Sequence, residues 1–270
     1  MSAELQLLWL ALTLYTLAGS IAIGSVALAK RPERAILALI VFGLAVHAVS
    51  LGLRWGRLGH GPFITMFEIL SSNVWSLLAI YALAYWRVPA VRPAAMVVMP
   101  VLFIMMAWLL VTSPAAGHFP PTYRTVWLYI HLLFGKIFLG AVLVSVGVSG
   151  LILLRRAGIG AAGLARLPDD LRLENLACRF IMVGFIFETL MLVAGAIWAQ
   201  DAWGRFWAWD PLETWAFATW LLLAFFIHLR VTVKLEPRHS AALIMAVFVL
   251  AFLTFFGVPF VSTAPHKGAV

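Results

Sequence analysis

Residues 36–53 read ILALIVFGLAVHAVSLGL, a run of eighteen residues with one histidine and no Asp, Glu, Lys or Arg. A helix of about 20 apolar residues is what crosses the hydrocarbon core of a bilayer. The whole chain shares this character, since 64% of its residues are hydrophobic, only 11% are charged and the mean hydropathy is +1.01. Water-soluble domains do not have this composition. We therefore predict an all-α, polytopic membrane protein.

Eight stretches of this kind predict about eight transmembrane helices, packed as one integral membrane domain over residues 1–270. The predicted spans are 5–28, 36–54, 64–86, 94–112, 125–153, 181–200, 212–234 and 240–260. The first span is longer than the apolar part of a secretory signal and no small-residue cleavage site follows it, so we expect it to be retained. In the longest polar connection, 155–179, Pro168-Asp169-Asp170 is typical of a helix start.

The basic residues are divided unevenly between the two ends of these helices. Of the 19 Lys and Arg residues, thirteen follow the odd-numbered spans, five lie on the opposite side and Lys136 lies within the fifth span. The side richer in Lys and Arg is normally cytoplasmic. Both termini, and the connection after the sixth span, are then expected on the periplasmic side of a bacterial cytoplasmic (inner) membrane. The net charge of +8 follows this rule, and no basic helix or aromatic signature indicates nucleic acid as a partner.

Cysteine usage limits the chemistry. Cys178 is the only cysteine, which excludes an intrachain disulfide, a CxxC pair and a CxxCH site for covalent haem in this chain. The sequence also has no Gly-rich phosphate loop, no GxSxG and no HExxH. A haem bound here would have to be held by axial ligands and packing.

A second stretch, WGRFWAWDPLETW at residues 203–215, contains a helix start. Asp210 is placed to cap a helix, Pro211 occupies its first position and Glu213 closes a capping box. These three residues predict that the seventh span begins here, on the outer side.

The capping pattern does not explain the four tryptophans of this stretch, which are Trp203, Trp207, Trp209 and Trp215. A belt of interfacial indoles explains one or two aromatic residues at a helix end. Trp203 and Trp207 would share one face if the stretch were helical. The concentration of indole predicts a flat, outward-facing aromatic platform for a large planar ligand.

Four histidines have positions that suit axial ligation. His47 and His228 lie inside apolar spans, where ionisable side chains are usually functional, although a neutral imidazole can also simply bond neighbouring helices. His131 comes one turn after Trp127 in TVWLYIH, and His266 lies in the C-terminal tail, both on the predicted outer side. Imidazole is a standard axial ligand of haem iron, which has two faces to fill.

Three stretches, 57–77, 125–131 and 173–230, resemble the CcsA family, the membrane subunit of the two-component bacterial and plastid cytochrome c synthase. The likeness covers residues 40–270. It implies a subunit of a haem lyase type enzyme that carries haem b (iron protoporphyrin IX) across the membrane and presents it for thioether attachment to a CxxCH apocytochrome c. The implied partners are a second synthase subunit with a large periplasmic domain (CcsB/ResB type), a thiol-reducing protein that acts indirectly, and membrane lipid.

The resemblance also implies the site residues. His131 and His266 resemble the external axial pair, and His47 and His228 resemble the pair that holds haem within the membrane. The loop 199–215 resembles the haem-binding WWD motif, and the implied cofactor-binding residues are Trp127, Trp203, Gly204, Trp207, Trp209, Asp210, Pro211, Glu213 and Trp215. Catalysis would be mostly positioning, so we predict no general acid or base.

Three alternatives remain at this point. A relative could export haem to a periplasmic haem chaperone, although such relatives lack the membrane pair that His47 and His228 resemble. A non-catalytic haem-binding regulator or assembly factor could share the fold. A transporter for another solute is disfavoured because no pair of broken helices marks a midplane site.

Two charged residues lie deep inside the spans. With a rise of about 1.5 Å per residue, Lys136 lies about 17 Å and Glu188 about 18 Å from the outer ends of their helices. Because a lone charge at this depth is unfavourable, we predict a structural Lys136–Glu188 ion pair. The alternative is that one of them meets a haem propionate or a lipid.

Overall fold

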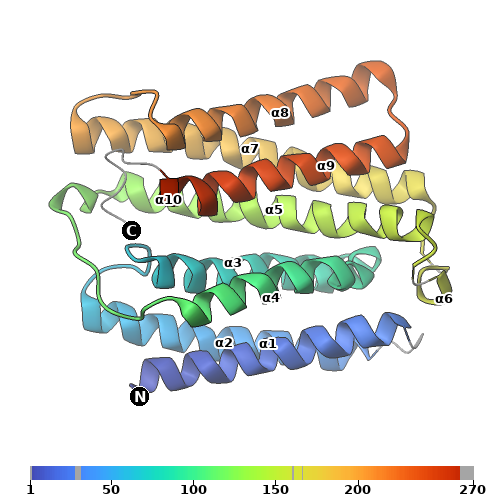
Figure 1. Cartoon of the computed structure of the whole chain (residues 1–270), viewed down its shortest axis with the longest axis horizontal. Coiled ribbons are helices and arrows are strands. Elements are labelled where there is room, and N and C mark those ends of the chain that lie inside the picture. Colours follow the sequence, from blue (N-terminus) through green and yellow to red (C-terminus); the bar gives the residue numbers. More distant parts are fainter. Residues whose placement is uncertain (1, 28–31, 160, 166, 262–270) are drawn as a thin grey trace.

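The computed structural model describes residues 2–27, 32–159, 161–165 and 167–261, and these residues form a bundle of helices that lie side by side (Figure 1). The α-helices are α1 Ala3–Ala27, α2 Glu33–Leu58, α3 Met66–Arg87, α4 Ala95–Val111, α5 Val126–Arg156, α6 Ala161–Leu164, α7 Asp170–Trp203, α8 Pro211–Val233, α9 Pro237–Phe252 and α10 Val258–Val261. Short 3₁₀ turns, η1 Pro89–Ala94 and η2 Pro121–Tyr123, precede α4 and α5, and a π turn, η3 Leu253–Gly257, follows α9. Eight helices of the described chain are long and apolar enough to cross a membrane. The prediction of an all-α protein with eight membrane helices is confirmed.

One predicted boundary is wrong. The sixth span was expected from 181, but α7 begins at Asp170. Asp169 caps it, because its side chain accepts a hydrogen bond from the backbone N–H of Arg172 at 2.8 Å. The helix start recognised at 168–170 is therefore the start of the membrane helix itself. The pattern of apolar residues locates the part of a helix that lies in the hydrocarbon core. The helix itself begins at its N-cap residue, which can lie several turns earlier.

Helix α5 forms the centre of the bundle. In its most apolar stretch 83% of the residues are buried, the highest share of any membrane helix described. It packs most extensively along α7, and also against α9, α3 and α4. Gly147 permits the close approach to α4, because a Cβ atom there would lie 2.6 Å from Val98 Cγ2.

A buried charge cluster ties the N-terminal helices together at one end. The Arg54 guanidinium of α2 donates to the Glu68 carboxylate of α3 at 2.8 and 3.0 Å and to the Glu4 carboxylate of α1 at 3.3 Å. It also donates to the carbonyls of Pro114 and Ala115, in the segment after α4. Because all of these acceptors converge on one side chain, Arg54 fixes the relative positions of three helices and a loop.

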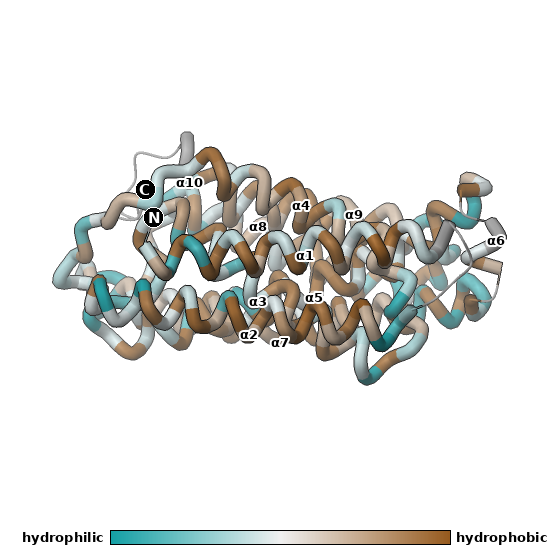
Figure 2. The backbone as a smooth tube through the Cα atoms, turned by 90° about the horizontal axis from the view of Figure 1, so that it is seen from below, coloured by the Kyte–Doolittle hydropathy of each residue, from teal (hydrophilic) through white to brown (hydrophobic). Residues whose placement is uncertain are grey.

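The two ends of the bundle are more polar than its middle (Figure 2). The start of α1, the 204–210 loop, the start of α5 and α10 all lie at the same end (Figure 1). Successive connections between the membrane helices therefore alternate between the two ends of the bundle, as the distribution of basic residues predicts. Which end faces the periplasm stays a prediction.

Candidate functional site

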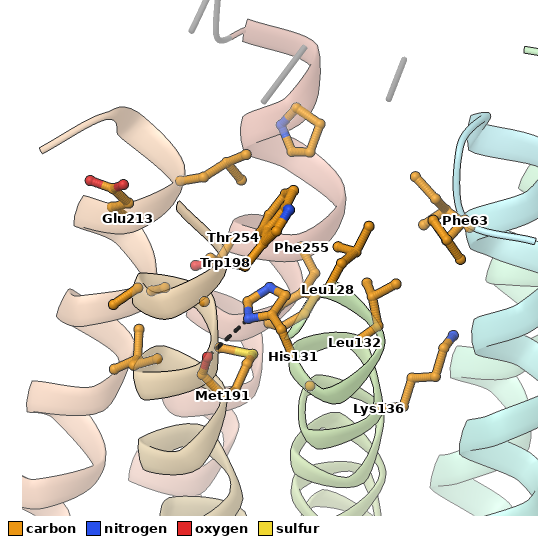
Figure 3. A pocket seen from close by; sticks show the side chains of 18 of the residues that line it. Phe63, Leu128, His131, Leu132, Lys136, Met191, Trp198, Glu213, Thr254 and Phe255 are labelled. Atoms are coloured by element: carbon orange, nitrogen blue, oxygen red, sulfur yellow. Dashed lines mark hydrogen bonds between the residues drawn. The ribbon is translucent and has the colours of Figure 1, made fainter. Parts of the chain in front are cut away.

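A cavity of about 230 Å³ lies beneath the 204–210 loop, at the end of the bundle that holds the start of α1. Helices α3, α5, α7 and α8 and the segment from η3 to α10 contribute to its walls (Figure 3). Most of the lining is apolar. Its basic and acidic side chains are His131, Lys136 and Glu213.

His131 is held by α7 in one orientation. Its Nδ1 lies 2.9 Å from the carbonyl oxygen of Met191 (Figure 3). A carbonyl only accepts, so Nδ1 carries a proton, and in the neutral imidazole Nε2 then carries the lone pair. Gly195 makes room for the ring, because a Cβ atom there would lie 2.8 Å from His131 Nδ1. This is the tautomer in which an imidazole ligates a metal through Nε2 while its other nitrogen is oriented by a carbonyl.

The loop is bounded by the caps that the sequence predicts. Helix α7 ends at Trp203, and Gly204 adopts the left-handed conformation with φ 73°. Asp210 Oδ1 accepts from the backbone N–H of Glu213 at 3.0 Å. Glu213 Oε2 in turn accepts from the N–H of Ala208 at 2.7 Å and of Asp210 at 3.4 Å. The capping box is confirmed, with Pro211 as the first residue of α8. Trp203 and Trp207 do not share a helical face, because α7 ends at Trp203 and the condition of that expectation is not met.

The tryptophans do not form one flat surface. The rings of Trp207 and Trp209 lie 5.7 Å apart at 85°, and both stand at 79° to the ring of Phe217. Of the four loop tryptophans only Trp207 lines the cavity. Its indole N–H is buried and has no hydrogen-bond partner among the described residues. The predicted flat platform is therefore wrong. The rings form an edge-to-face cluster, and the indole N–H of Trp207 is buried in the protein.

Trp209 has an unusual backbone for a large side chain. Its φ is +59°, in the left-handed region, and its side chain is 67% exposed. Such a conformation costs about 1–3 kcal/mol and is concentrated at functional sites. The loop therefore holds one indole outward at a conformational cost.

The remaining predicted tryptophans lie around the cavity without lining it. Trp203 packs against Trp198, with ring centroids 5.0 Å apart. Trp127 packs beside the same cluster, and Trp215 is partly exposed on α8. Trp198 was not among the predicted site residues, although it lines the cavity and its ring lies 5.8 Å from that of His131.

The two membrane histidines do not come together. His47 on α2 is fully buried, with Nε2 2.9 Å from Ser71 Oγ and Nδ1 3.3 Å from the Tyr15 hydroxyl. His228 is exposed on α8. Helices α2 and α8 lie at opposite edges of the bundle (Figure 1). The prediction that these histidines form one site is wrong, and His47 fits the alternative of an imidazole that bonds neighbouring helices. His266 lies outside the described residues.

The predicted Lys136–Glu188 ion pair is also wrong. Lys136 Nζ donates instead to Ser72 Oγ on α3 at 2.9 Å. Glu188 is fully buried, and neither carboxyl oxygen has a hydrogen-bond partner in the described part of the chain. The two residues match in depth, but depth does not fix the direction in which a side chain leaves its helix.

The amino-acid sequence that forms this site is similar to those of known proteins. The family model described as cytochrome C assembly protein matches residues 35–266. The chain belongs to this family. Membership confirms the CcsA-type resemblance and a role in cytochrome c biogenesis for this multi-pass membrane protein.

The similar curated proteins agree with the family. The cytochrome c biogenesis protein CcsA of Synechococcus sp. (strain CC9902) is 29% identical over an alignment of 288 positions, which covers 95% of this chain and 93% of that protein. The CcsA proteins of Prochlorococcus marinus subsp. pastoris (strain CCMP1986 / NIES-2087 / MED4) and Prochlorococcus marinus (strain MIT 9312) are 29% identical over 261 residues and 28% over 248 residues. These matches cover 87% and 81% of this chain, and 82% and 79% of the respective relatives.

Proposed function

We propose that this chain binds haem b in the cavity beneath the tryptophan loop and presents it for covalent attachment to a CxxCH apocytochrome c. It acts as one subunit of a cytochrome c synthase in a bacterial cytoplasmic membrane, with the loop on the periplasmic face. The observation that carries this proposal is His131. Its Nδ1 donates to the Met191 carbonyl, so Nε2 has the lone pair that haem iron requires.

The residues present fit a haem. The cavity is mostly apolar, and Trp207 contributes a buried indole N–H that has no hydrogen-bond partner among the described residues. Ligand pockets usually measure about 300–1,000 Å³, and this one measures about 230 Å³. A group as large as haem would therefore extend out of the cavity, past the exposed rings of Phe206 and Trp209. An edge that protrudes here is accessible to a second protein.

This chain's contribution to the reaction is positioning. A bound haem supplies the iron and the two vinyl groups that become thioethers with reduced cysteine thiols. His131, with His266 as the second expected ligand, would hold the haem. Trp198 and Trp207 line the cavity and would exclude water from the bound face. Holding two reactants in register is a major source of rate enhancement, so no residue of this chain needs to act as acid or base.

The membrane histidines have separate roles in this proposal. His228 is exposed on α8, where it would bind haem on its way to the outer site with a second ligand from outside the described chain. The second synthase subunit of the CcsB/ResB type is the candidate source of that ligand. His47, with both nitrogens engaged by Tyr15 and Ser71, would stabilise the packing of α1, α2 and α3.

Co-expression with the partner subunit and a CxxCH apocytochrome tests the function. We expect covalent haem on the cytochrome with the unaltered chain and almost none with His131→Ala. The amount of covalent haem is measured by haem staining of denaturing gels. Haem bound to the chain without any covalent product would instead favour an exporter that feeds a haem chaperone, or a haem-binding regulator.

A further inference from the structure

The cavity continues inward beyond His131 and reaches a lysine on its α3 side. Lys136 follows His131 by five residues on α5, which places it about 7.5 Å further along the helix axis. Figure 3 shows the His131 ring turned toward α7 and the Lys136 side chain turned toward α3. Both side chains line the same cavity, together with Ser72 and Asn73. One cavity therefore contains a metal-binding nitrogen and, deeper, a group of polar side chains.

The Lys136 ammonium has unused hydrogen-bonding capacity. It carries three N–H donors, and among the described residues it donates to Ser72 Oγ at 2.9 Å. None of the ion pairs among the described residues includes it. Ser72 and Asn73 are themselves 5% and 7% exposed. A cation at this depth is normally paired or lines a functional site, and here it faces a cavity.

The acidic side chain of the cavity lies on a different wall. Glu213, at the start of α8, already accepts hydrogen bonds from the backbone N–H groups of Ala208 and Asp210. A carboxylate that enters the cavity is repelled by Glu213 and attracted by Lys136. A ligand with negative charge at one edge is therefore expected to bind with that edge toward Lys136 and away from Glu213.

We infer that Lys136, oriented by its hydrogen bond to Ser72 Oγ, binds a carboxylate of the cavity's ligand and so determines which edge of that ligand faces outward. This inference rests on the proposed function, in which the ligand is haem. Haem carries its two propionate carboxylates at one edge and its vinyl groups elsewhere on the ring. With a propionate held at Lys136, the vinyl groups are turned toward the loop, where an apocytochrome approaches. Lys136 is thus a positioning residue.

Two porphyrins that differ only at the carboxylates test the inference. The purified chain, freed of bound haem, is titrated with iron protoporphyrin IX and with its dimethyl ester, and binding is followed by Soret absorbance. We expect the unaltered chain to prefer the free acid at least tenfold, which corresponds to one charge-assisted hydrogen bond. Lys136→Met should reduce this preference to nearly one while it leaves the affinity for the ester unchanged.

Matched variants complete the experiment. Lys136→Arg should keep the preference for the free acid, and Ser72→Ala should lower it only partly. Arg179→Met removes the same charge from an exposed position on α7 and should change neither affinity. The ester is an internal control for folding, because its binding requires the cavity but not the ammonium.

Three outcomes overturn the inference. The preference survives in Lys136→Met, or the variant loses affinity for both porphyrins by the same factor, or it loses bound anionic lipid while the preference stays unchanged. In each of these cases the unaltered chain still binds haem and the proposed function stands. If the unaltered chain binds neither porphyrin, the proposed function itself fails.

Discussion

His131 shows how far a single residue can be interpreted from sequence. Its position after Trp127 in TVWLYIH indicates an exposed histidine near an aromatic loop. The tautomer of its neutral ring depends on the Met191 carbonyl, sixty residues later in the chain. The space for its ring depends on Gly195, which has no distinguishing pattern around it. Such long-range complementarity between α5 and α7 only becomes visible once the two helices are packed.

Gly195 gives a prediction at this scale. Replacing glycine with alanine inside a helix usually stabilises the helix by about 1 kcal/mol. In Gly195→Ala the new methyl group would instead meet His131 Nδ1 at 2.8 Å and displace the ring from the Met191 carbonyl. We expect most of the bound haem to be lost in purification, as measured by Soret absorbance per protein. Gly52→Ala is the control, since nothing lies within 4 Å of a Cβ atom there; equal haem retention in the two variants would contradict the account of His131.

Glu188 gives a second prediction. It is fully buried, with no hydrogen-bond partner for either oxygen in the described chain, and a buried unsatisfied polar group costs about 1–3 kcal/mol. Glu188→Leu should therefore raise the thermal unfolding temperature in detergent. Glu174→Leu on the same helix removes a carboxylate bonded to Arg230 at 2.7 Å and should lower that temperature. The changes in unfolding free energy caused by Glu188→Leu and Lys136→Met should be additive. A coupling free energy above about 1 kcal/mol in the double variant would show that the two side chains do interact.

At the scale of elements, the caps were predictable and one helix length was not. The Asp210 and Glu213 capping box follows from four consecutive residues and is present. A similar helix start was recognised at Asp169 but was placed in the polar connection 155–179, outside the sixth span. Helix α7 continues through its polar first turns because Asp170 and Glu174 pair with basic residues of neighbouring segments. Hydropathy does not detect such pairing, so it placed the start of the helix eleven residues too late.

The capping box should contribute measurably to stability. Asp210→Ala removes the acceptor of the Glu213 N–H, and loss of an N-cap side chain costs about 1 kcal/mol. We expect a lower thermal unfolding temperature for this variant. The comparison is Glu236→Ala at the start of α9, where the side chain makes no capping hydrogen bond and the temperature should hardly change. Equal shifts in both variants would show that the cap does not support the loop.

At the scale of the whole molecule, composition predicts the number of helices but not their neighbours. Eight apolar stretches were enough for a membrane bundle, and the distribution of Lys and Arg was enough for a sidedness prediction. Neither the apolar stretches nor the distribution of Lys and Arg indicates which helices pack against each other. His47 and His228 were paired through the family resemblance, although α2 and α8 lie at opposite edges of the bundle (Figure 1).

Sidedness can be measured because Cys178 is the only cysteine. In a Cys178→Ser background, Arg205→Cys places a thiol in the exposed loop and Arg238→Cys places one at the exposed start of α9. A membrane-impermeant maleimide should label position 205 in intact cells and position 238 only after permeabilisation. The reverse pattern would place the tryptophan loop in the cytoplasm and exclude its proposed role.

The absorption spectrum of the detergent-purified chain tests the central claim, that His131 and the tryptophan loop together hold haem. The unaltered chain should show a Soret band. His131→Ala should lose most of it and regain it with added imidazole, because the small ligand replaces the missing axial nitrogen. Trp207→Ala should lose haem without rescue, because imidazole does not restore packing. Full haem retention in both variants would contradict the claim.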